Sequence, residues 1–341
     1  MKWRDKLGLK REVQECLVER AAFSSTRLDD LRNQISQSKH LQSLPDLSIF
    51  ASGSYGRLEA GRHSDIDLFF LCNKRPSEYA GLNISKIQMM SEIIDIARAM
   101  HFPEFSNDGE FLSVLFVPEI LDNLGGRSDD YANHFTARLL LLLEGRPLTN
   151  AAAFQTATEN IIESYFRDYP HHPEDFRPTF LTNDIIRFWK TLCLNYENRR
   201  NALGSNREVD SARRRKQQIK NYKLKFSRAL TCFATIGILS TFDTSVEPKD
   251  VADLCELAPI DRLAQIADRR PKAKTAVKDA IALYSSFLRT TAKSPDELAA
   301  YFADEKNRTN AFKEAALFGD RMFDMLTRID MNQRKVRYLV I

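Results

Sequence analysis

Two aspartates separated by one residue are the part of the sequence best suited to chemistry. Asp65 and Asp67 flank Ile66 and lead into the apolar run Leu68 to Cys72. On a β-strand, residues two apart project to the same face about 7 Å from each other, while the residue between them points into the core. Close like charges are unfavourable unless a cation offsets them, and carboxylate oxygens suit Mg²⁺. The pair therefore predicts a metal site, with Mg²⁺ as the expected ion and Mn²⁺ as the alternative.

A glycine and a serine stand upstream of the aspartates and suggest a phosphate-binding turn. Gly53 and Ser54 follow the short apolar stretch Leu47 to Ala51. Glycine permits close backbone approach, and a helix that starts there would offer free N–H groups to a phosphate chain. Metal ions beside a phosphate chain support in-line displacement at phosphorus. The expected phosphate contacts are Gly53, Ser54, Arg57 and Ser64, with pairing to Glu59 as the alternative for Arg57.

The order of these groups resembles a known family. Gly53-Ser54, a loop from Tyr55 to Ser64 and the Asp-x-Asp pair are similar to the nucleotidyltransferases of the DNA polymerase β superfamily. The motif looks most like a bacterial branch that includes the uridylyltransferase domains of nitrogen-signalling enzymes and related uncharacterised nucleotidyltransferases. A later Arg138-Leu139-Leu140 run followed by Gly145 is also similar to that branch. The resemblance is specific over residues 50–75 and looser up to residue 150.

The resemblance implies an activity and a third carboxylate. The expected reaction moves a nucleoside monophosphate from a nucleoside triphosphate (an NTP such as ATP, or a dNTP) to an acceptor hydroxyl and releases pyrophosphate. A third acidic residue on a neighbouring strand would complete the metal site, and Glu110, just before the apolar stretch Phe111 to Val117, is the expected one. Asp108 and Glu119 are the alternatives, as a turn residue and as a helix-start residue.

The spacing of apolar residues predicts the elements that hold this site. We expect a helix over 10–40, strands at 47–51, 65–71 and 111–117, and a helix over 84–100. The rest of the chain is predicted to be almost entirely helical, over 130–146, 151–167, 181–199, 208–238, 248–268, 272–291 and 305–328, with a terminal strand at 336–341. The expected fold class is α+β: a small mixed-sheet nucleotidyltransferase domain in residues 1–128, followed by an all-helical domain in residues 129–341.

The predicted helical domain carries polar side chains that suit a nucleotide. One stripe of the helix expected over 181–199 consists of hydrogen-bonding residues, namely Asp184, Arg187, Thr191 and Asn195. This helix and the stretch Lys220 to Arg228 also resemble the helical domain attached to the same bacterial enzymes. We therefore expect nucleotide contacts from Arg187, Lys190, Lys223 and Ser227, the last two sharing a helix face. A solvated helix surface is the alternative.

Positive charge gathers in one part of the chain. The net charge of the protein is only +4, but residues 199–228 contain eleven Lys and Arg residues against Glu208 and Asp210. Such a local excess favours a nucleic-acid partner, so the expected acceptor is a nucleotide or an oligonucleotide. Two alternatives stay open: transfer to a protein side chain, and an inactive nucleotide-binding or interaction module.

Apolar composition and the N-terminal residues bear on the compartment. Unbroken apolar runs are far shorter than the roughly 20 residues that a membrane span needs, so no span is expected. The first residues lack the apolar stretch and cleavage site of a secretory signal, and the five cysteines are widely spaced. These features predict a cytoplasmic protein.

Overall fold

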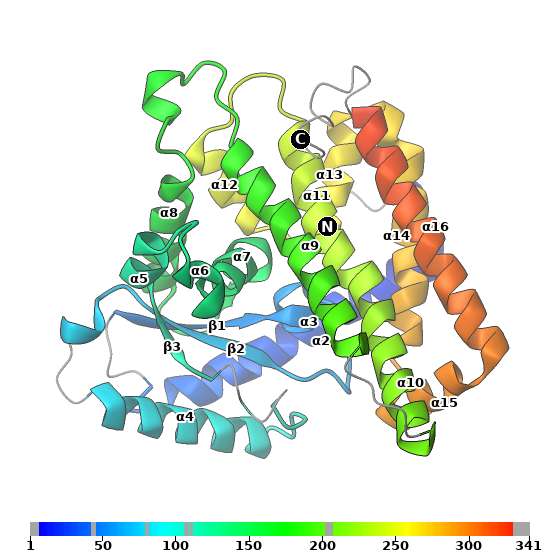
Figure 1. Ribbon diagram of the computed structural model, residues 1–341, viewed down its shortest axis with the longest axis horizontal. Helices are drawn as coiled ribbons and strands as arrows, with labels where there is room; N and C mark the ends of the chain where they lie inside the picture. The colour runs from blue at the N-terminus through cyan, green and yellow to red at the C-terminus, as the bar shows by residue number, and fades with distance from the viewer. Residues whose placement is uncertain are drawn as a thin grey trace. The chain divides into compact units, whose positions relative to one another are not determined.

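The chain forms two compact units, a sheet unit and a helical unit. The computed structural model describes residues 7–41, 46–78, 82–105, 109, 112–201 and 207–329 (Figure 1). The sheet unit consists of Val18–Phe176 and Glu247–Ala258. The helical unit consists of Met1–Leu17, Arg177–Val246 and Pro259–Ile341.

A four-stranded mixed sheet forms the centre of the sheet unit. Its strands lie in the order β3-β2-β1-β4, with bounds β1 (Leu47–Ser52), β2 (Asp67–Cys72), β3 (Val114–Phe116) and β4 (Arg146–Pro147). β1 pairs antiparallel with both β2 and β4, while β2 and β3 run parallel. The structure confirms the predicted mixed-sheet α+β class. The strand expected over 65–71 begins at Asp67, two residues late, and the two-residue β4 was not predicted.

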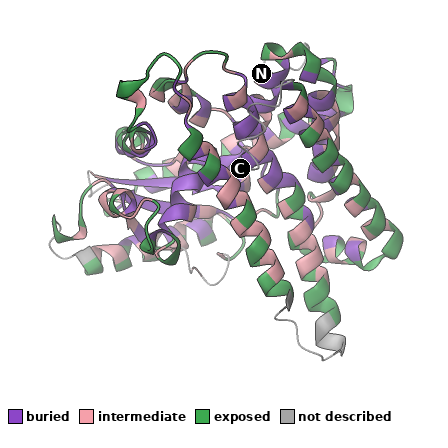
Figure 2. Cartoon of the chain, turned by 45° about the horizontal axis from the view of Figure 1, so that its top comes forward, coloured by how far each residue is buried: buried purple, intermediate pink, exposed green. Residues whose placement is uncertain are grey.

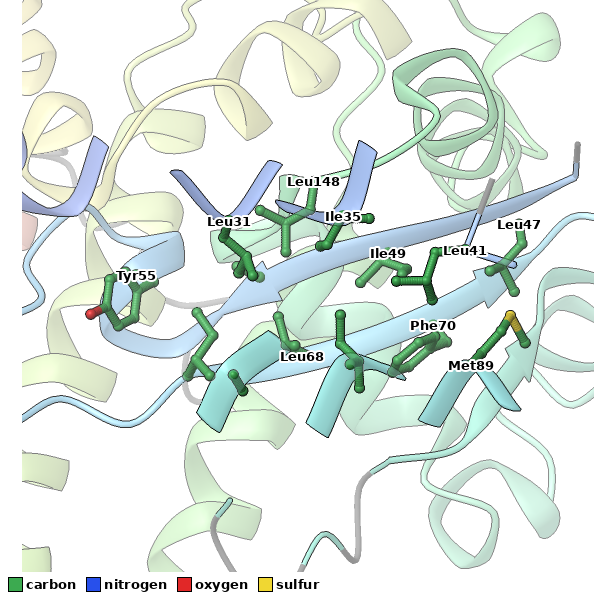
Figure 3. Close-up of a cluster of buried hydrophobic side chains, with 14 of the residues drawn as sticks. Leu31, Ile35, Leu41, Leu47, Ile49, Tyr55, Leu68, Phe70, Met89 and Leu148 are labelled. Atoms are coloured by element: carbon green, nitrogen blue, oxygen red, sulfur yellow. The ribbon is translucent and has the colours of Figure 1, made fainter. Parts of the chain in front are cut away.

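One face of this sheet packs on two long helices, α2 (Arg11–Ser36) and α4 (Leu82–Ala99). Ile49 and Phe70 project to this face and pack in one buried cluster with Met89 of α4 and leucines of α2 (Figure 3). Alternate residues of each strand thus share a core, as the period of two requires. The strands are buried along almost their whole length (Figure 2).

The opposite face of the sheet packs on α7 (His134–Glu144) and α8 (Ala151–Ser164). Phe50 and Phe69 stack on each other with ring centroids 5.2 Å apart, and Phe154 of α8 meets Phe50 edge-on at 5.7 Å. Helices therefore cover both faces of the sheet. The sequence suggested a division between residues 128 and 129, but the compact units divide the chain differently. α7 and α8 stay with the sheet because both pack directly on β1.

Short helices complete the sheet unit, which holds α3 (Gly53–Gly56), η1 (Pro76–Glu78), α5 (Val117–Asp122), α6 (Ser128–Tyr131), η3 (Tyr169–His171) and α12 (Pro248–Cys255). The helix expected over 84–100 is confirmed as α4. Met89, Ile93 and Ala97 pack in the core, whereas Ile84 and Ile87 are 67% and 70% exposed.

The helical unit is helical throughout the elements that the structure describes in it, which confirms the predicted helical part. Its helices are α9 (Thr179–Asn201), α10 (Arg207–Lys223), η4 (Leu224–Arg228), α11 (Ala229–Ser240), α13 (Pro259–Arg269), η5 (Pro271–Ala273), α14 (Lys274–Thr290), α15 (Pro295–Ala303) and α16 (Glu305–Ile329). Aromatic rings fill its core, where Phe226 stacks on Phe287 with centroids 4.8 Å apart.

Several predicted helices are divided in the structure. The helix expected over 208–238 contains a π-helical turn, η4, between α10 and α11. The helix expected over 248–268 is two helices, α12 and α13, because Pro259 starts a new first turn. The strand expected over 336–341 lies outside the described residues. Nowhere in the described ranges is a helix both long and apolar enough to span a bilayer.

Candidate functional site

Asp67 lies at the edge of the sheet beside the turn that follows β1. It is the first residue of β2 and pairs across the sheet with Ser52, the last residue of β1. Gly53 comes next, with a positive φ of 64°. A Cβ placed on Gly53 would come within 2.1 Å of Oδ2 of Asp67. Position 53 therefore requires glycine twice over, for its left-handed backbone and for its contact with the carboxylate.

Asp65 lies two residues before Asp67, outside β2. Ile66 between the two aspartates is buried, while Asp65 and Asp67 are both half-buried. Burial raises the pKa of the Tyr55 hydroxyl, a nearby Arg27 opposes the rise, and the negative charge of Asp65 adds to it. Asp65 therefore lies near the Tyr55 hydroxyl, and Asp67 lies against Gly53. Asp67 thus borders the turn Gly53–Gly56, and the charge of Asp65 reaches Tyr55 of the same turn.

Arg27 of α2 is a neighbour of this site that the sequence did not reveal. Its guanidinium acts on the Tyr55 hydroxyl and lowers the pKa of that group, and its Nη2 donates a hydrogen bond to the carbonyl of Met100 at 2.7 Å. It also lies 4.3 Å from the ring centroid of Phe102, which Tyr55 meets edge-on at 5.5 Å. The Tyr55 hydroxyl points away from the other labelled side chains of the hydrophobic cluster (Figure 3). No sequence signal joins Arg27 to this turn, since the two belong to different elements.

The side chain of Glu144 binds the turn Gly53–Gly56 from the interior of the protein. Glu144 is the last residue of α7, and its side chain is completely buried. It accepts hydrogen bonds from Ser52 Oγ at 3.0 Å, from Gly53 N at 3.2 Å and from Arg57 Nη1 at 2.8 Å. One carboxylate thus binds the end of β1 and both ends of the turn. The sequence placed Glu144 in a run resembling the bacterial enzymes but assigned it no role.

Arg57 does not have the surroundings expected for a phosphate contact. Its side chain is only 6% exposed, and it forms ion pairs with two buried carboxylates. The Nε atom lies 3.1 Å from Oε2 of Glu59, and Nη1 bonds Glu144. Buried charges are stable only when paired and hydrogen-bonded, so Arg57 is engaged in holding the turn. The expected phosphate contact is corrected to this internal role.

The turn also differs from the helix N-terminus that the sequence predicted. α3 is a single turn of four residues, and the N–H of its first residue, Gly53, donates to Glu144. Ser54 is half-buried at this turn. Ser64 closes a second turn directly before Asp65, where its Oγ accepts the N–H of Gly61 at 3.0 Å. Phosphate contact by the hydroxyls of Ser54 and Ser64 stays a prediction, and the N–H of Gly53 at the start of the helix is occupied by Glu144.

The predicted third carboxylate, Glu110, and its alternative Asp108 both lie outside the described residues. The other alternative, Glu119, lies half-buried on α5. Within the described part of the chain, no three His, Cys, Asp or Glu side chains come together as a metal site. Asp65 and Asp67 supply two oxygen ligands of the kind that hard divalent cations prefer, so the residues present fit such an ion.

The predicted nucleotide contacts of the helical unit have varied surroundings. Arg187 lies 3.6 Å from the buried carboxylate of Asp184, and Lys190 is exposed on α9. Lys223 is exposed at the end of α10, but Ser227 is buried within η4. Lys223 and Ser227 therefore do not form one exposed face, because η4 packs its own residues into the core. Contact of these residues with a nucleotide stays a prediction.

Comparison with known proteins agrees with this geometry. Residues 31–132 match the family model described as "Nucleotidyltransferase domain". The matched segment contains β1, β2 and β3 together with Gly53, Asp65 and Asp67. No curated protein and no solved structure matches the chain. Over residues 31–132 the chain is thus similar to nucleotidyltransferase domains, consistent with the DNA polymerase β-like superfamily that the motif resembles.

Proposed function

We propose that this protein is a metal-dependent nucleotidyltransferase. It moves a nucleoside monophosphate from an NTP or dNTP to the hydroxyl of a nucleotide or oligonucleotide and works in the cytoplasm. The observation that carries the proposal is the position of Asp65 and Asp67. Asp67 lies against Gly53 and the charge of Asp65 acts on the Tyr55 hydroxyl, inside the segment that matches the nucleotidyltransferase family.

The reaction is a displacement at the α-phosphorus. The acceptor hydroxyl oxygen forms a bond to this phosphorus, and the bond from phosphorus to the oxygen that bridges to the β-phosphate breaks. Pyrophosphate leaves with that oxygen, and the hydroxyl proton is released to solvent. Negative charge concentrates on the phosphate oxygens during this step, so groups that neutralise this charge determine the rate.

A divalent cation would supply that neutralisation. Asp65 and Asp67 would hold it, and Glu110 is proposed as the third ligand. Bound Mg²⁺, or Mn²⁺ as the alternative, would stabilise the charge on the attacking and leaving oxygens. Buried Ile66 fixes the backbone between the two aspartates, which keeps both carboxylates at the sheet edge. Gly53 leaves the room that Asp67 occupies.

Polar groups near the aspartates would bind the triphosphate. We assign this role to the hydroxyls of Ser54 and Ser64, which lie at the two turns that follow β1 and precede Asp65. Gly53, which has no side chain, would let the phosphates approach closely. Arg187, Lys190, Lys223 and Ser227 of the helical unit are proposed as further nucleotide contacts. Arg57 is left out of this set because Glu59 and Glu144 pair with it.

The test is a transfer assay with each NTP and dNTP labelled at the α-phosphate. Purified protein is incubated with Mg²⁺, Mn²⁺ or EDTA, and with free nucleotides, oligonucleotides or no added acceptor. We expect label on a nucleotide or an oligonucleotide, in a metal-dependent reaction that the Asp67→Asn protein does not support. Label on protein side chains alone would support the protein-acceptor alternative. Triphosphate binding without any transfer would show an inactive nucleotide-binding module and overturn the proposal.

A further inference from the structure

Helix α10 carries a straight row of cations on one face. Arg213, Lys216, Lys220 and Lys223 follow one another at steps of three, four and three residues, which places them on one side of an α-helix. All four side chains are exposed. The row spans about 15 Å, since an α-helix rises about 1.5 Å per residue. We call these four residues the α10 stripe.

The charges that act on Lys220 of the α10 stripe are also positive. Lys220 is exposed, but the part of its side chain that packs against the protein lowers its pKa, and the charges of Arg199, Lys216 and Lys223 lower it further. Arg199 belongs to α9, which packs beside α10. Residues 211–223 contain no Asp or Glu. The stripe is therefore a concentration of like charge without an acidic partner on the same stretch of helix.

This arrangement is unfavourable for an isolated helix, because like charges three and four residues apart repel each other. A bound polyanion would reverse the effect. One strand of a nucleic acid advances about 3.4 Å per phosphate when its bases are stacked, so the row faces about four phosphates. Acidic protein partners usually add an apolar anchor to such a contact. The described side chains of α10 include no exposed large hydrophobic residue.

We propose that the α10 stripe binds the phosphate backbone of a nucleic-acid strand. It rests on the proposed function in one respect: the bound strand is assigned the part of the acceptor. The contact itself needs neither triphosphate nor metal, because it is made by cations of the helical unit. Binding can therefore be measured without catalysis, and its failure can be told apart from failure of the transfer reaction.

The experiment compares two variants that lose the same charge. In the stripe variant, Arg213, Lys216, Lys220 and Lys223 are all changed to Ser. In the control, four exposed lysines elsewhere in the helical unit are changed to Ser: Lys272, Lys274, Lys306 and Lys313. Affinity for a single-stranded oligonucleotide, a duplex and polyglutamate is measured over a range of salt concentrations, without triphosphate or metal.

We expect the stripe variant to bind the oligonucleotide at least about tenfold more weakly than the unmodified protein at low salt, and the control variant to bind it as tightly as the unmodified protein. Its salt dependence should also be shallower, by about 0.7 in log–log slope per lost contact for a single strand and about 0.9 for a duplex. Equal losses in the control would show general attraction between net charges and overturn the site. An unchanged slope in the stripe variant would do the same. Polyglutamate binding that is as tight and as sensitive to the stripe would replace the proposal with an acidic protein partner.

A smaller change covers the case in which four substitutions disturb the fold. The double variant Arg213→Gln and Lys220→Gln keeps hydrogen-bonding side chains on the helix and leaves Lys223, a proposed nucleotide contact, intact. We expect about half of the slope change of the full stripe variant, because two of four contacts are lost. A double variant with the slope of the unmodified protein would contradict the proposal. Circular dichroism confirms that each protein compared is folded.

Discussion

The carboxylate of Asp67 occupies the space that any side chain on Gly53 would need, since a Cβ there would lie 2.1 Å from Oδ2. The two residues face each other across the end of the β1–β2 ladder, where Ser52 pairs with Asp67. From the sequence, the glycine at this position is explained by the close approach of a phosphate chain. The structure adds a second reason, because the glycine also determines where a proposed metal ligand lies.

Gly53→Ala should therefore damage catalysis through Asp67. The added methyl group forces the carboxylate away and strains a backbone with φ of 64°. We expect the transfer rate to fall about 100-fold, because displacing a reactive group by about 1 Å has an effect of that size. Gly319→Ala is the matched control, since a Cβ on that helical glycine meets nothing within 4 Å. A Gly53→Ala enzyme with the full rate would disprove the coupling.

Asp65→Asn and Asp67→Asn should each remove transfer while leaving the fold intact. Both side chains are half-buried at the sheet edge, so the isosteric amide is accommodated, but it loses the charge that would hold a cation. We expect a loss of at least about 100-fold in turnover, as for removal of one strong transition-state contact. Asp95→Asn, on an exposed position of α4, is the control. Near-normal turnover of Asp67→Asn in saturating Mg²⁺ would contradict the assignment of Asp67 as a metal ligand.

Much of the sheet unit could be predicted because its signals are local. Leu47 to Ala51 reads as a strand from its own composition, and Gly53, Asp65 and Asp67 lie within fifteen residues of one another. The family match over residues 31–132 confirms what this short motif indicated. Local signals give less information about where a strand begins and ends. The strand β2 was therefore predicted to begin at Asp65, although that residue lies outside the β1–β2 ladder.

Contacts between distant residues could not be predicted. Glu144 lies 87 residues from Arg57 in the chain, and nothing in either neighbourhood indicates that they meet. Arg57 was therefore assigned to phosphate from its position in the motif, whereas a carboxylate on α7 binds it in the interior. Arg27 was missed for the same reason, since its partner Tyr55 belongs to another element.

Removing Glu144 should destabilise the protein strongly. The carboxylate is fully buried and satisfies Ser52, Gly53 and Arg57, so Glu144→Ala leaves a buried guanidinium with one partner fewer. We expect the free energy of unfolding in urea to fall by about 3–5 kcal/mol, as for other broken buried ion pairs. The double variant Glu144→Ala and Arg57→Ala should lose less than the sum of the two single losses. Strictly additive losses would show that the pair is not coupled.

His134 should make the stability of the fold depend on pH. Its side chain is buried at the start of α7, and this burial lowers its pKa below the usual 6.5, although the charges of Glu119 and Asp129 oppose the change. Within the described residues, Nδ1 has no hydrogen-bond partner to hold an added proton. The unfolded chain therefore binds this proton more readily than the folded one, so the contribution of His134 to stability is fully present above pH 6.5 and is lost as the pH drops below that value.

Urea unfolding of His134→Gln should show a weaker loss of stability on acidification than the unmodified protein. The control His171→Gln, at an exposed position, should lose stability on acidification as the unmodified protein does. Identical pH dependence in the His134→Gln and unmodified proteins would rule out this histidine as the source.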